Sequence, residues 1–251
     1  MGADMIATGH YAKIAKYKDH FVLDTPKDNS KDQSYFLHAL SSEQLSHVMF
    51  PLGDLTKKEV REIARTHNLP VSDKKDSTGI CFIGNQKFDE FITQHLKAIP
   101  GDIIDENGKV LGKHKGLVCY TLGQRKGIGL GGIKDNESEN NTHKPWYVAA
   151  KDVVNNTLTI VQNTNHPLLM SKNVEASHMH WVLEETPKVG DKLMAQVRYR
   201  QQKQACTVVE ASDEKVVVEF DSPQRAVTLG QSLVLYSGNY CLGGGFISYY
   251  K

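Results

Sequence analysis

Cysteine is scarce in this sequence, and no two cysteines are spaced as a pair. Four occur among 251 residues, at positions 81, 119, 206 and 241. Without a Cys-x-x-Cys spacing, neither a zinc ribbon nor the disulfide framework of a secreted domain is predicted. We therefore expect reduced thiols in a cytoplasmic protein.

Signals for export or anchoring are also missing. The N-terminus has no basic segment followed by an apolar stretch, and no apolar run approaches membrane-spanning length. Ile6 stands where an N-myristoylation signal requires serine or threonine. We expect a protein that is neither exported nor anchored and that has no membrane partner.

An excess of one charge is absent too. The 30 Lys and Arg residues nearly balance 29 Asp and Glu residues, which leaves a net charge of +1. A nucleic-acid partner must therefore be argued from local basic clusters, each of which is more often a solvated face. The candidates are Lys57-Lys58 with Arg61 and Arg65, the segment 109–115, Arg125-Lys126, and Arg198 with Arg200 and Lys203.

Three regions differ in their pattern. Residues 1–86 mix a short apolar strand at 5–9 with a helix from Thr56, where Thr56 and Glu59 form a capping box and Asn68 ends the helix. Val60, Ile63 and Ala64 form its apolar face, and a second core-packing helix is predicted over 88–96. We expect the strand at 5–9 to be buried.

The pattern becomes extended after residue 100. Asn107-Gly108 between two apolar pairs predicts a hairpin, 127–145 reads as a long mobile loop, and several alternating segments follow residue 167. One of them runs from Leu229 to Leu235. The predicted fold class is α/β plus β, with a β-rich central region at 87–166 and a C-terminal β-barrel at 167–251.

Cys81 is the leading chemical candidate. It lies in the run 77–84, where small residues precede a thiol flanked by apolar side chains, and Lys74 and Lys75 lie just upstream. Nearby cations favour the thiolate, which is the reactive form. The alternative is a buried and inert thiol.

Two polar motifs precede it. Gly9-His10-Tyr11 follows the first predicted strand, where a glycine lets a ligand approach the backbone, although a simple turn is the plainer interpretation. The segment 31–36 offers a cation, a carboxylate, an amide and a hydroxyl before a helix, for recognition of a base or phosphate. Asp32 is alternatively only an N-cap.

Two further patterns are weaker. His178 and His180 would share one face of a strand, but no third ligand of suitable spacing accompanies them, so no metal site is predicted. Residues 120–129 contain Gly-x3-Gly-x-Gly, which matches neither the dinucleotide fingerprint nor the P-loop. A basic, flexible, RNA-contacting loop is the better interpretation.

Six strings together carry a family resemblance. In order they are 7–11 (ATGHY), 31–37 (KDQSYFL), 50–53 (FPLG), 76–84 (DSTGICFIG), 120–127 (YTLGQRKG) and 197–201 (VRYRQ). In this order they resemble the tRNA-specific 2-thiouridylases (the MnmA or TrmU family) over essentially the whole chain.

The resemblance implies a fold and an activity. The fold would be a partial adenine-nucleotide hydrolase-like α/β domain, a small central domain and a tRNA-binding β-barrel. The activity would be ATP-dependent 2-thiolation of the wobble uridine of tRNA, with Mg²⁺ accompanying the ATP. The uridine C2 oxygen is first adenylated, because a carbonyl oxygen leaves poorly until it is esterified to phosphate.

The resemblance also implies roles for single residues. Cys81 would accept sulfur from a donor protein, such as a cysteine desulfurase or a sulfur relay protein, and carry it as a persulfide. Gly9 would line the ATP site. The residues implied to contact tRNA are His10, Lys31, Asp32, Gln33, Arg198, Tyr199 and Gln231.

The chain departs from the family pattern in two respects. The sequence lacks the Ser-Gly-Gly-x-Asp-Ser pyrophosphate loop that the family has upstream of Gly9. It also lacks the segment that holds the family's second catalytic cysteine, and none of Cys119, Cys206 and Cys241 matches that cysteine. We therefore expect these 251 residues alone to be deficient in adenylation and thiolation. The alternatives are a non-catalytic tRNA-binding module and an incompletely folding product.

Overall fold

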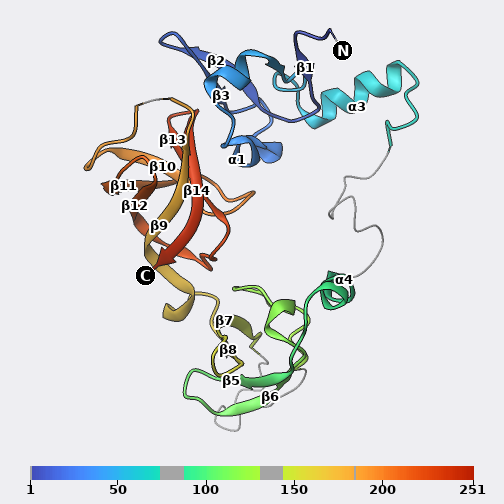
Figure 1. The fold of residues 1–251 in the computed structure, drawn as a ribbon. Coiled ribbons are helices and arrows are strands. Elements are labelled where there is room, and N and C mark those ends of the chain that lie inside the picture. The colour runs from blue at the N-terminus through green and yellow to red at the C-terminus, as the bar shows by residue number, and fades with distance from the viewer. Residues whose placement is uncertain (1, 74–87, 131–143, 184) are drawn as a thin grey trace. The chain divides into compact units, whose positions relative to one another are not determined.

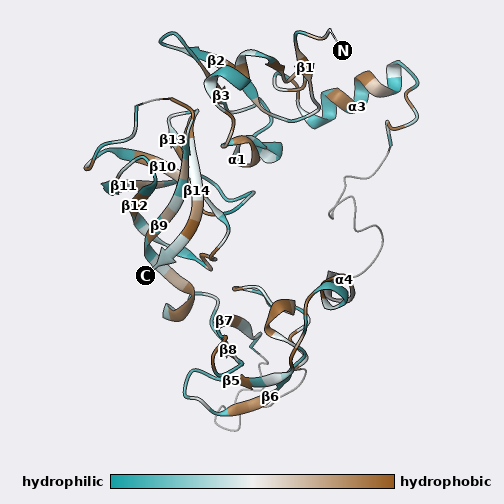
Figure 2. Ribbon diagram, in the orientation of Figure 1, coloured by the Kyte–Doolittle hydropathy of each residue, from teal (hydrophilic) through white to brown (hydrophobic). Residues whose placement is uncertain are grey.

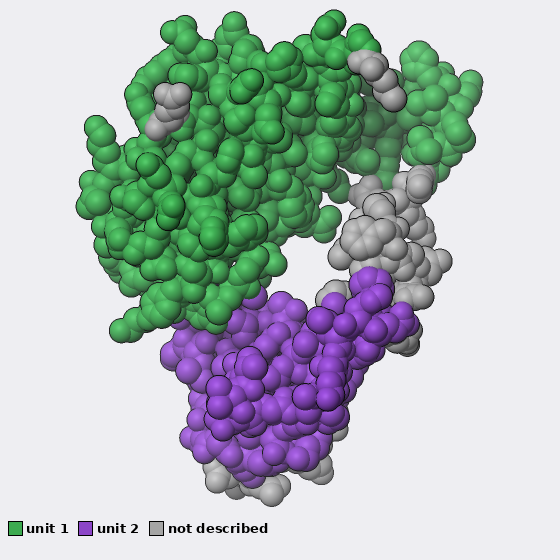
Figure 3. Space-filling view, in the orientation of Figure 1, with its two compact units in different colours: residues 1–75, 172–223, 229–251 green, residues 76–171, 224–228 purple. Residues whose placement is uncertain are grey.

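The computed structural model describes residues 2–73, 88–130, 144–183 and 185–251 (Figure 1). The chain divides into two compact units (Figure 3). The first comprises Met1–Lys75, Lys172–Pro223 and Leu229–Lys251, and the second comprises Asp76–Ser171 and Gln224–Thr228. The first unit thus combines the two ends of the sequence. The predicted domain boundaries near residues 86 and 166 stay a prediction.

A β-barrel forms most of the first unit. Among the described residues, its strands follow the order β13, β10, β11, β12, β9 and β14, and a further pairing of β13 with β14 closes the ring. The strands are β9 (Met170–Trp181), β10 (Lys192–Gln196), β11 (Gln204–Ala211), β12 (Lys215–Arg225), β13 (Ser232–Ser237) and β14 (Tyr240–Tyr250). The predicted C-terminal barrel is therefore confirmed.

An N-terminal hairpin extends the barrel sheet. It consists of β2 (Lys13–Tyr17) and β3 (His20–Asp24), and β3 pairs antiparallel with the first residues of β14. From Gly243 onward β14 pairs instead with β9. Gly243 has a φ of 140°, and a Cβ there would collide with the His180 carbonyl, so only glycine fits where the neighbour changes.

Short elements complete the N-terminal segment. They are β1 (Ile6–Ala7), a 3₁₀ turn (Asn29–Lys31), α1 (Ser34–Leu37), α2 (Ser42–Ser46), β4 (Val48–Met49) and α3 (Lys57–Thr66). The strand expected at 5–9 exists as β1, which pairs with β4 in parallel, but its burial was predicted wrongly. Ile6 is 64% exposed, because β1 pairs along one edge with the two-residue strand β4.

The predicted capping box of α3 is confirmed. The Thr56 side chain accepts a hydrogen bond from the Glu59 amide, and the Glu59 carboxylate accepts one from the Thr56 amide. Polar and apolar residues mix along the helix in Figure 2. Ala64 is buried but Ile63 is 46% exposed, so the expected core-packing face is realised only in part.

The two ends of the chain share a hydrophobic core. Val234 and Tyr236 of β13 pack in one cluster with Val22 and Leu23 of β3 and with Leu45 of α2. β13 is therefore buried without a break from residue 233 to 236. The alternation expected there was wrong, because the N-terminal segment covers the second face of this strand.

The second unit contains a small sheet in the order β6, β5, β8 and β7. Its elements are α4 (Phe88–His95), β5 (Gly101–Ile104), β6 (Val110–His114), β7 (Tyr147–Asp152), β8 (Thr157–Val161) and 3₁₀ turns at Leu117–Cys119 and Pro167–Leu169. The predicted hairpin is confirmed by β5 and β6, with Gly108 at a φ of 83° in the turn. No helix in the described ranges is long and apolar enough to cross a membrane.

We predict that the start of α3 becomes less stable in acid. A hydrogen bond from Lys27 first, and bonds from Thr56 second, lower the pKa of Glu59 to about 2 from its usual 4.5. The carboxylate therefore stabilises the fold above pH 4.5, and this contribution disappears as the pH falls toward 2. Glu59→Gln should lower the urea midpoint at neutral pH, and its difference from the wild type should shrink on acidification.

Glu62→Gln is the matched control, because Glu62 lies on the same helix and, among the described residues, its carboxylate forms only a loose ion pair with Lys58 at 3.9 Å. Equal pH dependence of the Glu59→Gln and Glu62→Gln differences would contradict the assignment.

Candidate functional site

The predicted segment 31–33 is held against the residue that follows His10. The Gln33 side-chain oxygen accepts a hydrogen bond from the Tyr11 amide at 2.9 Å, and the Gln33 amide donates to the Tyr11 carbonyl at 2.9 Å. The Asp32 carboxylate accepts a hydrogen bond from the Ser34 amide at 2.9 Å, but the N-cap of α1 is Gln33, so Asp32 is not the N-cap that its plainer interpretation expected. Local bonds therefore fix this turn at the start of α1.

Gly9 and His10 lie at the exposed end of β1. His10 shares a 2.9 Å hydrogen bond with the Thr8 hydroxyl and meets Phe50 edge to face. Gly9 is exposed, and a Cβ added there would touch only Leu52 at 3.9 Å. The backbone at Gly9 is open to a ligand, which agrees with both a ligand site and a plain turn.

Arg198 and Tyr199 lie in a tight turn that follows β10. The Gln201 side chain accepts a hydrogen bond from the Val197 amide at 2.9 Å, and the Gln201 amide donates to the Arg198 carbonyl. Gln196 donates to the Gln201 carbonyl. These bonds turn polar groups inward, while the side chains of Arg198 and Arg200 are exposed.

A buried polar chain connects α1 to this turn. The Tyr236 hydroxyl donates to Gln196 at 2.8 Å and lies 3.2 Å from the Ser34 hydroxyl. All three side chains are buried, and burial raises the pKa of Tyr236, so its hydroxyl keeps its proton. Tyr236 therefore couples residues about 160 positions apart through one phenol.

Lys203 lies beside the same phenol. Its ammonium is 3.8 Å from the Tyr236 ring centre and donates to the Thr25 hydroxyl at 2.9 Å. Burial lowers the pKa of Lys203, and the charge of Asp32 opposes that change. One member of the predicted basic cluster is thus a structural cation, whereas Arg198 and Arg200 face outward.

Gln231 joins the same region. The Gln231 carbonyl accepts a hydrogen bond from the Ile247 amide at 2.7 Å, and Gln231 is exposed. The adjacent Ser232 accepts a bond from the Tyr35 hydroxyl at 2.9 Å and shares one with His38 at 3.1 Å. Segments 31–33, 198–199 and 231 therefore all adjoin α1 or its contacts.

Cys81 lies outside the described residues. Cys119, Cys206 and Cys241 are free and buried. Burial raises the pKa of both Cys206 and Cys241 to about 12, so these two thiols stay protonated and unreactive at neutral pH.

The two histidines of β9 do not share a face as expected. His178 has a left-handed φ of 52° where the pairing with β14 shifts register, and this interrupts the alternation of side chains. His178 is exposed and His180 is partly buried. Within the described ranges, no three His, Cys, Asp or Glu side chains form a cluster suited to a metal ion.

The glycine-containing segment after Tyr120 is more ordered than expected. The Gly123 amide donates to the Val148 carbonyl at 2.8 Å, and the Val148 amide donates to Gln124 at 3.0 Å. Arg125 and Lys126 are exposed at its tip. The loop therefore presents positive charge from a hydrogen-bonded base on β7.

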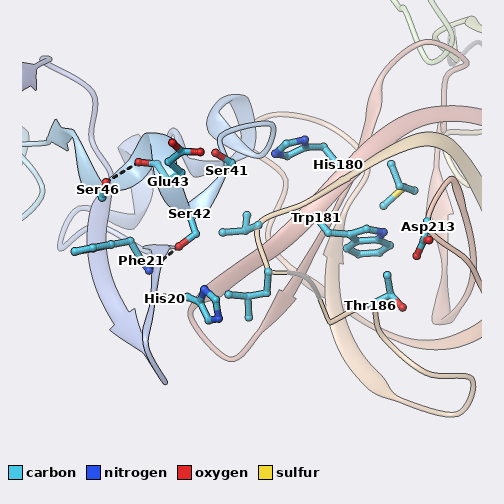
Figure 4. A pocket seen from close by; sticks show the side chains of 13 residues that line it. His20, Phe21, Ser41, Ser42, Glu43, Ser46, His180, Trp181, Thr186 and Asp213 are labelled. Atoms are coloured by element: carbon cyan, nitrogen blue, oxygen red, sulfur yellow. Dashed lines mark hydrogen bonds between the residues drawn. The ribbon is translucent and has the colours of Figure 1, made fainter.

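A polar groove of about 730 Å³ lies beside α2 and the end of β9 (Figure 4). Its serine hydroxyls already have partners, since Ser42 accepts a bond from the Phe21 amide and Ser46 donates to Glu43. The ring nitrogens His180 Nε2 and Trp181 Nε1 have no partner among the described residues, but both are inaccessible. The serine hydroxyls and these two ring nitrogens are therefore not free for a ligand.

Two residues of this region, Tyr236 and Phe36, are not among the predicted site residues. Phe36 is 58% exposed. The available signal was the pair of aromatic residues, Tyr35 and Phe36, that follows the polar run 31–34.

Comparison with known proteins gives three consecutive domain matches. The matched families are described as a tRNA methyl transferase HUP domain at residues 1–85, a tRNA methyl transferase PRC-barrel domain at 89–162, and an aminomethyltransferase beta-barrel domain at 171–247. The predicted α/β plus β fold class, with a β-rich middle and a C-terminal barrel, is confirmed.

Curated relatives match along the whole chain. A protein of Aliarcobacter butzleri called tRNA-specific 2-thiouridylase MnmA 2 is 93% identical over 251 residues, which is all of this chain and 68% of that protein. MnmA of Burkholderia ambifaria is 50% identical over 99% of this chain and 64% of its own length. MnmA of Alcanivorax borkumensis is 49% identical over 98% of this chain and 66% of its own length. The chain spans about two thirds of these relatives.

We predict that the Tyr236 hydroxyl stabilises the first unit. Tyr236→Phe leaves the buried Gln196 oxygen without its donor, which should lower the free energy of unfolding by about 1–3 kcal/mol in urea titrations. Tyr249→Phe is the control, because Tyr249 is 56% exposed. A Tyr236→Phe protein as stable as the control would show that the buried chain is dispensable.

Proposed function

This chain belongs to the tRNA-specific 2-thiouridylase family, and from that premise we propose that its protein replaces the C2 oxygen of the wobble uridine of tRNA with sulfur. The observation that carries the proposal is 93% identity over the entire chain to a relative of that name. The arrangement of the first unit supports it, because segments 31–33, 198–199 and 231 adjoin one helix.

Adenylation of the uridine is the first proposed step. ATP would esterify the C2 oxygen, which then leaves with AMP, and Mg²⁺ would accompany the phosphates. Gly9 is the proposed ATP contact in this chain. Its exposed backbone and the open space around its Cα support close approach of a nucleotide.

Sulfur transfer is the second step, with Cys81 as the carrier. A donor protein would load the thiol to a persulfide, and the terminal sulfur would attack C2 and displace AMP. A second thiol then attacks Cys81 Sγ, so that the S–S bond of the persulfide breaks and a disulfide forms as the sulfur leaves on uridine. The burial of Cys119, Cys206 and Cys241 argues that none of the three performs this last attack.

Binding of tRNA rests on the surface around α1. The proposed contacts are His10, Lys31, Asp32, Gln33, Arg198, Tyr199 and Gln231. Arg198 and Arg200, in the turn after β10, are both exposed, and neither forms an ion pair with another described residue. Two unpaired guanidinium groups are well suited to phosphate oxygens.

We predict that Cys81 alone takes up sulfur. After incubation with a cysteine desulfurase and cysteine, intact and peptide mass spectra should show one added sulfur atom on Cys81, and Cys81→Ser should abolish it. The raised pKa values of Cys206 and Cys241 should keep them unmodified at neutral pH. Equal loading of the buried cysteines, or none of Cys81, would overturn its role as carrier.

We predict that tRNA binding depends on Arg198 and on salt. Arg198→Ala should weaken binding of unmodified tRNA by roughly tenfold and reduce the salt dependence by about one phosphate contact. Lys192→Ala removes an exposed positive charge from the other end of β10 and is the matched control. Cys81→Ser should bind as the wild type does.

Filter binding across a salt series measures these affinities. No detectable binding by the wild type at low salt would defeat the proposed function. Binding of tRNA without any loading of Cys81 would favour a non-catalytic tRNA-binding module.

A further inference from the structure

Phe36 is exposed because its neighbours in α1 are fixed in the core. Ser34 and Tyr35 are 1% and 4% exposed, and the Tyr35 hydroxyl both donates to the Ser232 carbonyl and accepts from the Ser232 amide. A helix of four residues whose first two side chains are buried must turn the next one away. Phe36 consequently remains 58% exposed.

Two residues of the turn after β10 continue this aromatic surface. The rings of Phe36 and Tyr199 have centres 4.4 Å apart at an angle of 41°, and the Arg200 guanidinium lies 5.4 Å from the Tyr199 ring centre. We call Phe36, Tyr199 and Arg200 the Phe36 platform. It joins residues that are over 160 positions apart in the sequence, and the buried bonds of Ser34 and Gln196 to Tyr236 hold its two halves together.

The charge around the platform indicates its ligand. Arg198 and Arg200 are both exposed, and in the described part of the chain neither pairs with a carboxylate. An apolar protein partner would have to desolvate both cations, whereas a nucleotide offers a flat ring for Phe36 and phosphate oxygens for the arginines. A base can reach a protein ring only when it is unpaired and unstacked.

We propose that the Phe36 platform stacks an unpaired base of the bound tRNA. This inference rests on the proposed function, because it names the part of the tRNA that the surface around α1 recognises. It gives Phe36 and Arg200 a direct role in binding, beyond the residues that the family resemblance implied.

The test compares two RNA probes, a stem-loop with unpaired loop bases and a fully paired duplex of equal length. Phe36→Ala should weaken binding of the stem-loop by about tenfold and leave duplex binding unchanged. Phe36→Tyr should retain most of the affinity, because it keeps the ring. Arg200→Asn, which tolerates the left-handed φ of 64°, should weaken both probes.

Tyr249→Ala is the matched control, because it removes an exposed aromatic ring from β14. Thermal melts show whether each variant is folded, and Phe36→Tyr separates ring loss from unfolding. Wild-type protein that binds neither tRNA nor the stem-loop would overturn the proposed function and this inference together. If Arg198→Ala weakens stem-loop binding while Phe36→Ala does not, or if Phe36→Ala weakens both probes equally, the platform alone is overturned.

Discussion

The pairing of β3 with β14 determines where α1 lies, and α1 organises the surface that we assign to tRNA. Two residue pairs make this junction, Asp24 with Tyr240 and Leu23 with Cys241. Tyr236 then adds buried contacts between Ser34 and Gln196. The buried Tyr236 hydroxyl is satisfied when both Ser34 and Gln196 are in place. Removal of one partner leaves a buried polar group without its hydrogen bond, which is costly. The junction is therefore specific as well as apolar.

This arrangement separates structural from exposed polar groups. The side-chain amides of Gln33, Gln196 and Gln201 form hydrogen bonds with backbone groups. The Lys203 ammonium lies against the Tyr236 ring. The exposed groups beside them include the cations Arg198 and Arg200 and the aromatic ring of Phe36. Such a surface suits RNA even though the whole chain carries a net charge of only +1, because recognition depends on local charge.

Local sequence patterns predicted local structure well. The capping box at Thr56 and the hairpin at Asn107-Gly108 are confirmed, because each depends on neighbours in sequence. Strands do follow residue 167, although the one expected from Leu229 begins at Ser232. The two-sided burial of β13 and the exposure of Phe36 could not be predicted in this way. Both depend on the N-terminal hairpin joining a strand more than 200 residues later. Most site residues came from family strings, and Cys81 remains a proposal.

We infer that α1 and the turn after β10 form one tRNA-binding surface. Hydrogen exchange followed by mass spectrometry, with and without unmodified tRNA, tests it most directly. We expect peptides covering 31–38 and 196–203 to gain protection together, over the same range of tRNA concentration. Protection of only one of these segments, or of neither while tRNA is bound, would contradict it.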